Sequence, residues 1–196
     1  MKVLALVLYL FSFSAIAMVP IIVPNEQELF ISQNTPVWCW AATSSALRNY
    51  YNKDEFITQE TIARNNPIAK ELGNEVITYA IVDKNIAPKA KDYLLDEVLS
   101  FKNYSGKISK FSKNEAQKLL DTGNPFALSF KFHVVIVYGY FKIQDSMFLL
   151  VFDPNGIPLT GRPFYYSSTE LYESIIGDSF ANIIFVKNKD TVLSAK

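Results

Sequence analysis

The hydrophobic pattern of this 196-residue chain changes its period near Gly123. Before this position, apolar residues recur mainly at spacings of three and four, which is typical of helices with one buried face. After it, they gather in short runs rich in Val, Ile, Phe and Tyr, bounded by Gly, Asn, Asp or Pro, which is typical of strands. A helix-rich half followed by a strand-rich half predicts an α+β domain with one core.

Capping residues and helix breakers place the predicted helices more closely. Thr58 and Asn74 can cap helix N-termini, and Ser112 with Glu115 three positions later forms a capping box. The first helix carries an amphipathic stripe and should begin near residues 37–39, which places Cys39 in its first turn. Residues 86–111 follow neither pattern clearly, and residues 93–101 fit a strand or a short helix. The predicted helices cover residues 37–51, 59–65, 75–84 and 113–122.

The pattern in the second half of the chain predicts the strands of one sheet. Residues 134–138 show no polar alternation, as expected of a central strand that is covered on both faces. If residues 143–146 turn a hairpin, antiparallel pairing returns residues 153–155 opposite residues 134–136, beside His133. The predicted strands cover residues 126–132, 134–141, 148–152, 163–166 and 181–186.

The N-terminal residues have the layout of a secretory signal peptide. Lys2 precedes an apolar stretch at residues 3–13, and an Ala-Ile-Ala cleavage pattern ends at Ala17. The stretch is shorter than the about 20 residues that a spanning helix needs. We therefore expect a signal peptide at residues 1–17, one domain at residues 18–196, and a secreted or periplasmic protein. An uncleaved N-terminal anchor is the alternative.

Charge and composition exclude several classes of partner and cofactor. The 19 Lys and Arg residues balance 19 Asp and Glu residues, so no bulk field attracts nucleic acid or an anionic membrane. One Cys and one His are too few for a structural zinc site, and no Gly-rich phosphate loop follows a strand. We expect no metal and no cofactor, no nucleic-acid partner, and no membrane partner after signal cleavage.

The single cysteine and the single histidine are the candidates for chemistry. A lone cysteine in an exported protein has no internal disulfide partner, so it stays free, pairs with another chain or is kept for a reaction. In the first turn of a helix, unpaired N–H groups stabilise a thiolate, the nucleophilic form. Cys39 is therefore the candidate nucleophile and His133 the candidate base. A buried inert thiol and a core or surface histidine are the alternatives.

Two further residues can complete such a site. Gln33, six residues before Cys39, can bring its side-chain amide beside the Cys39 backbone N–H and stabilise an oxyanion; a solvent-facing Gln is the alternative. Asp153 or Asn155 can orient the imidazole, and we favour Asp153 because a carboxylate also stabilises the imidazolium. The segment Asp153-Pro154-Asn155-Gly156 also has the composition of an ordinary turn.

The quoted segments resemble a known family. Gln33, Cys39-Trp40-Ala41-Ala42, the His133 segment through Gly139-Tyr140, and Asp153-Pro154 together look like the papain-like cysteine proteases of clan CA. They are closest in style to the small bacterial C39-like and AvrRpt2-type peptidases. The resemblance implies Gln33 as oxyanion donor, Cys39 as nucleophile, His133 as base and Asp153 as orienting acid. It also implies a helical left subdomain that carries Cys39, an antiparallel-sheet right subdomain that carries His133 and Asp153, and a substrate cleft between them.

The function expected from this site is an exported thiol peptidase that hydrolyses protein or peptide amide bonds through an acyl-enzyme. The same machinery serves deamidation, transamidation and isopeptide cleavage, which are the alternatives within catalysis. An inactive papain-like binding module is the alternative outside it. The expected partner is a protein or peptide substrate, and we expect the protein to act as a monomer.

Overall fold

The computed structural model describes residues 19–35, 38–65, 98–101, 104–129, 133–143, 146–155, 164–167 and 182–188. Within these ranges helices and strands combine in an α+β fold, which confirms the fold class expected from the sequence. The order of elements is β1 (Ile21–Ile22), η1 (Glu26–Leu29), α1 (Cys39–Tyr51), α2 (Gln59–Asn65), β2 (Tyr104–Lys110), α6 (Lys113–Asp121), β3 (Phe126–Ser129), β4 (Val134–Ile143), β5 (Ser146–Phe152), β6 (Phe164–Ser167) and β7 (Asn182–Asn188).

Helix α1 begins and ends where the sequence predicts. Its first residue is Cys39, and Asn52 caps its C-terminus with a backbone N–H that bonds the Arg48 carbonyl. The amphipathic stripe, however, understates its burial, because every residue from Cys39 to Leu47 is buried. Small side chains, Ala and Ser, fill the positions between the larger apolar ones and let neighbouring elements approach from several sides. Helix α1 contacts α2, η1, β3 and β4, so it is a core helix.

The other described helices follow their capping residues. In α2 the Thr58 hydroxyl accepts a hydrogen bond from the Thr61 backbone N–H at 3.2 Å, as an N-cap does. In α6 Ser112 caps the helix by accepting from the Glu115 N–H. The Glu115 carboxylate accepts from the Ser109 hydroxyl, rather than from the Ser112 backbone N–H as in a complete capping box. The predicted helix at residues 75–84 lies outside the described residues. None of the described helices has the length and apolar character that crossing a membrane requires.

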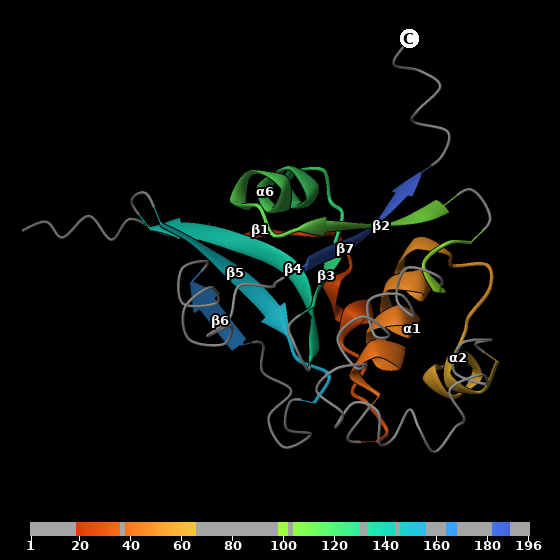
Figure 1. The fold of residues 1–196 in the computed structure, drawn as a ribbon. Coiled ribbons are helices and arrows are strands. Elements are labelled where there is room, and N and C mark those ends of the chain that lie inside the picture. The colour runs from red at the N-terminus through yellow and green to blue at the C-terminus, as the bar shows by residue number, and fades with distance from the viewer. Residues whose placement is uncertain are drawn as a thin grey trace, which may run out of the picture.

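The described strands form one antiparallel sheet in the order β2-β7-β3-β4-β5-β6, and β1 pairs with β4 beyond the end of β3. Figure 1 shows α1 and α2 together on one side, with the β4–β5 hairpin extending away from them and α6 lying over β1. The hairpin forms where it was predicted, with Ile143 opposite Ser146. Residues 134–138 are all buried, as a central strand should be. The predicted strand at 126–132 is described only as far as Ser129.

Two strands were not anticipated. Strand β1 has only two residues, too few to show a period. Strand β2, with the sequence Tyr-Ser-Gly-Lys-Ile-Ser-Lys, has few of the β-branched and aromatic residues that favour strands, and it lies in the ambiguous stretch at 86–111. It is held by seven-residue pairing with β7. In both cases the partner strand, rather than intrinsic propensity, determines the structure.

Candidate active site

Cys39 lies at the N-terminal end of α1, at the inner edge of the site. It is a free cysteine and only 4% exposed. Trp38 precedes the helix, and its carbonyl accepts the first helical hydrogen bond from the Ala42 N–H at 2.9 Å. The sulfur therefore sits beside N–H groups at the start of a helix, where a negative charge is stabilised.

His133 immediately precedes β4 and lies against Asp153, which immediately follows β5. The imidazole Nε2 is 2.5 Å from the Asp153 Oδ1. The Cys39 side chain also interacts with the imidazole and helps to raise the pKa of His133. Since Nε2 is engaged by the carboxylate, Nδ1 is the ring nitrogen left to face the sulfur. The side chains of His133 and Asp153 are 28% and 21% exposed, so this side of the site is partly open to solvent, whereas the thiol is buried.

The surroundings of His133 favour its charged form. Burial acts first and by itself lowers the pKa of the imidazole, because an apolar environment disfavours the cation. Hydrogen bonds to Asp153 and Cys39, and the negative charge of both groups, act in the other direction and are stronger together. The result is a pKa raised from the ordinary 6.5 to about 9. At neutral pH the ring is an imidazolium placed between a carboxylate and a sulfur.

A β-bulge gives Asp153 its place. The hairpin follows the predicted register from the pair Ile143 and Ser146 to the pair Gly139 and Leu150. Beyond that pair the register shifts by one residue, so that Val137 pairs with Val151 and Ile136 with Phe152. Tyr138 is the extra residue. Extended by one position beyond the last pair, Ile136 and Phe152, this register would place Asp153 opposite Val135, whereas the predicted register would place it opposite Ile136.

This shift of one residue decides on which face of the sheet the carboxylate lies. Opposite residues of an antiparallel pair share a face, and alternate residues of a strand do so too. Asp153 opposite Val135 therefore shares a face with His133, two positions before Val135. Opposite Ile136 it would point to the other face, away from the imidazole. An isolated Gly inside a strand pattern, here Gly139, is the sequence signal that indicates a bulge.

Between the two candidates for orienting the imidazole, the structure places Asp153 against His133. Asn155 donates its backbone N–H to the same Asp153 Oδ1 at 2.8 Å. This bond closes a turn after Asp153 in which the Asp side chain holds the backbone two residues on. The segment is thus both a turn and the support of a carboxylate that contacts the histidine.

Gln33 lies beside this turn. Its backbone N–H donates to the Pro154 carbonyl at 2.9 Å. Its side-chain Nε2 donates to the Thr35 carbonyl at 2.7 Å, which leaves the second N–H of the amide for another acceptor. Its Oε1 is buried without a partner among the described residues.

Thr35 completes a closed chain of contacts and was missed by the sequence analysis. Its carbonyl also accepts from the Trp38 N–H at 3.2 Å, directly before Cys39. Hydrogen bonds and peptide bonds therefore run from His133 through Asp153, Pro154, Gln33, Thr35 and Trp38 to Cys39, and the Cys39 side chain interacts with the imidazole where this path began. A backbone carbonyl carries no signal of residue type, so no sequence pattern could have indicated this role. All four residues proposed from the sequence belong to this one network.

The arrangement suits nucleophilic chemistry more than metal binding. Within the ranges that the structure describes, no group of three or more His, Cys, Asp or Glu side chains is placed to hold a metal ion. When a thiol, an imidazolium and a carboxylate lie together, the sulfur can instead attack a carbonyl carbon and the imidazolium can give a proton to the leaving group.

Comparison with known proteins agrees with this chemistry. The sequence model of the Peptidase_C39-like family matches residues 26–173, a range that includes Gln33, Cys39, His133 and Asp153. Among curated proteins no sequence matches the chain. The family match confirms the resemblance to papain-like cysteine peptidases, and the α+β fold is compatible with theirs.

Proposed function

This chain belongs to the Peptidase_C39-like family, and membership of this family suggests cysteine peptidase activity. We propose that the protein hydrolyses peptide bonds with Cys39 as nucleophile. The observation that carries the proposal is the contact of the His133 Nε2 with the Asp153 Oδ1 at 2.5 Å, together with the interaction of Cys39 with the same imidazole. The thiolate is the attacking form of cysteine, and a neighbouring imidazolium stabilises it.

The proposed reaction has two halves. The Cys39 Sγ attacks the substrate carbonyl carbon, the oxygen becomes an oxyanion, and the C–N bond breaks as the His133 imidazolium gives its proton to the leaving amine. The neutral imidazole then takes a proton from water, whose oxygen attacks the thioester, and the carboxylic acid leaves as the thiolate re-forms. Asp153 holds the ring and stabilises its charge. Gln33 can supply an oxyanion donor with its second amide N–H.

The test of the nucleophile uses the reactivity of Cys39 towards iodoacetamide, because the chain has no second cysteine to confuse the result. At pH 6 an ordinary thiol with a pKa of about 8.5 is only roughly 0.3% thiolate. We expect native protein to react at least about tenfold faster than His133→Ala at that pH. The same chain unfolded in urea gives the rate of an unactivated thiol. Equal rates for the native protein and the variant would contradict the proposal.

The test of the reaction uses protein beginning at Met18, incubated with a peptide library. New amino termini indicate hydrolysis, and Cys39→Ala should abolish them. Release of ammonia, or an amine-linked product without backbone cleavage, would replace hydrolysis by deamidation or transamidation. We also propose export to the periplasm or the medium, on the strength of residues 1–17; a mature chain that retains these residues would contradict it.

A further inference from the structure

The bulge at Tyr138 lies where β4 changes partner. On one edge of β4, β3 pairs as far as Val137, and β1 takes over at Gly139 and Tyr140. On the other edge, β5 pairs with Val137 and Gly139 but not with the residue between them. The extra residue and the change of partner therefore coincide. The register that places Asp153 on the face of His133 begins at this point.

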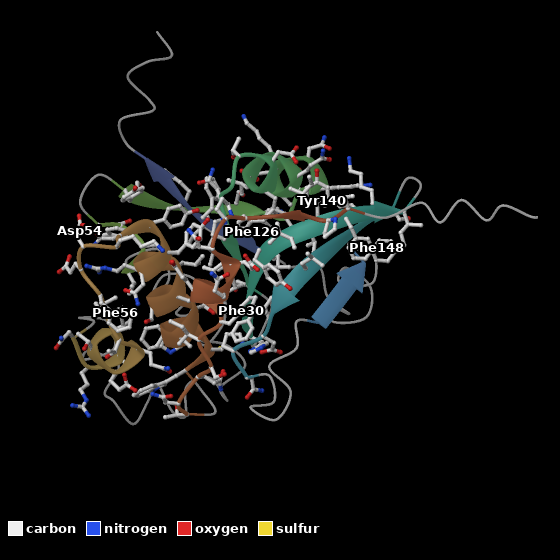
Figure 2. The ribbon with its side chains drawn as sticks, turned by 180° about the vertical axis from the view of Figure 1, so that it is seen from behind. Phe30, Asp54, Phe56, Phe126, Tyr140 and Phe148 are labelled. Atoms are coloured by element: carbon white, nitrogen blue, oxygen red, sulfur yellow. The ribbon has the colours of Figure 1, made fainter. Side chains whose placement is uncertain are left out.

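The segment that includes β1 and Phe30 holds the bulge from two sides. The Val23 N–H donates to the Tyr138 carbonyl at 2.9 Å, directly after β1. The Phe30 ring packs edge to face on Tyr138, with centroids 5.2 Å apart, and stacks on Phe152 at 5.0 Å. Tyr138 is only 3% exposed. Figure 2 shows Phe30 between the helical elements and the hairpin. One segment thus contacts the bulge and the residue before Asp153.

Glycine at position 139 makes this contact possible. A Cβ there would lie 2.5 Å from the Ile21 carbonyl oxygen, 3.0 Å from the Leu150 Cδ1 and 3.2 Å from the Ile22 Cα. The Leu150 side chain can adjust, but the two atoms of β1 belong to the backbone, so relief of the clash requires β1 and β4 to move apart. That movement would carry Val23 away from the Tyr138 carbonyl. The absence of a side chain at this position is therefore coupled to the bulge.

We propose that Gly139 and Val23 are positioning residues of the site. Gly139 lets β1 pair closely with β4, and the Val23 N–H binds the Tyr138 carbonyl, so together they stabilise the bulge at Tyr138. The register that follows the bulge turns Asp153 towards His133. This proposal rests on the proposed function, in which His133 and Asp153 take part in catalysis. Neither Gly139 nor Val23 touches the reacting atoms. Without the bulge, the regular hairpin register would leave the imidazole without its carboxylate.

The primary test is the titration of His133 by NMR, which is simple to assign because the chain has one histidine. Gly139→Ala should lower the pKa of His133 from about 9 by about 1–3 units, the usual effect of losing an opposite charge at contact distance. It should also slow alkylation of Cys39 at pH 6. Gly106→Ala is the matched control, because Gly106 lies in β2 at the far edge of the sheet and should leave both measurements unchanged.

A second pair of variants decides the matter if Gly139→Ala does not fold. Val23→Pro removes the N–H that reaches the Tyr138 carbonyl, whereas Ile22→Pro removes an N–H that points away from β4, since successive N–H groups of a strand alternate in direction. We expect only Val23→Pro to lower the pKa of His133. The same pKa in both variants, or an unchanged pKa in folded Gly139→Ala, would overturn the proposal.

A double-mutant cycle separates positioning from general destabilisation. If Gly139 acts through Asp153, Gly139→Ala should slow alkylation in the wild-type background but have little effect in Asp153→Asn. Additive effects would contradict the proposal. If wild-type Cys39 reacts no faster than in His133→Ala, the proposed function fails. The titration of His133 still decides the positioning role, because it requires no catalysis.

Discussion

The two sides of the site are held in place by different forces. Cys39 begins a helix that is buried from Cys39 to Leu47, so packing fixes the position of the sulfur. His133 and Asp153 lie just outside the ends of two strands and are partly exposed, so hydrogen bonds, charge and strand register fix their positions. Packing is insensitive to pH, whereas a charged pair is not. The two sides should therefore respond differently to substitution and to titration.

The first way to test this difference is to weaken the packing of α1. Leu47 is fully buried, so Leu47→Ala should lower the free energy of unfolding by about 2–5 kcal/mol through lost burial and the resulting cavity. The loss should be the same at pH 6 and pH 9, as measured by denaturant unfolding. Phe56→Ala is the control, because Phe56, which is labelled in Figure 2, is 73% exposed. A loss that changes with pH would show that packing and charge are not separable here.

The second test acts on Gln33, which bonds to segments on both sides of the site. Gln33→Ala removes the proposed oxyanion donor, and the barrier should rise by about 2.7–4 kcal/mol, or roughly 10²–10³ in kcat. The pKa of His133 should change little, because its contacts to Asp153 and Cys39 remain. Peptide hydrolysis and NMR titration measure the two effects. The matched control is Gln27→Ala, at an exposed position in η1. A normal kcat in Gln33→Ala would remove Gln33 from the mechanism.

The same contrast explains which features were predictable from the sequence. Packing follows from the order of apolar residues, so the start of α1 at Cys39, the Ser112 cap and the central strand at residues 134–138 were all predicted correctly. These features depend on local periods and on capping chemistry, which residue types encode directly.

The features that were missed depend on partners distant in sequence. Strand β1 forms by pairing with β4 at Gly139 and Tyr140. The register shift that moves Asp153 arises from the bulge at Tyr138, whose carbonyl accepts a hydrogen bond from the Val23 N–H. Thr35 contributes only a backbone oxygen. Residue types do not specify such backbone pairings, although Gly139 within a strand was a usable signal. The candidate residues could therefore be named from the sequence, but the register that aligns them could not.

The last test is the pH dependence of stability that the His133 pair should produce. The folded-state pKa of His133 is about 9, above its ordinary value of 6.5. Its stabilising contribution is therefore fully present below about pH 6.5 and is lost as pH rises through about 9. A shift of this size corresponds to a loss of stability on the order of 3 kcal/mol.

Denaturant unfolding of wild type and His133→Ala across this pH range isolates the contribution of His133 to the free energy of unfolding. Asp153→Asn should reduce this contribution, whereas Asp54→Asn, at an exposed position, should not. If the difference between wild type and His133→Ala stays constant with pH, the pair is held by shape rather than by charge, and the two sides of the site do not differ in the way described.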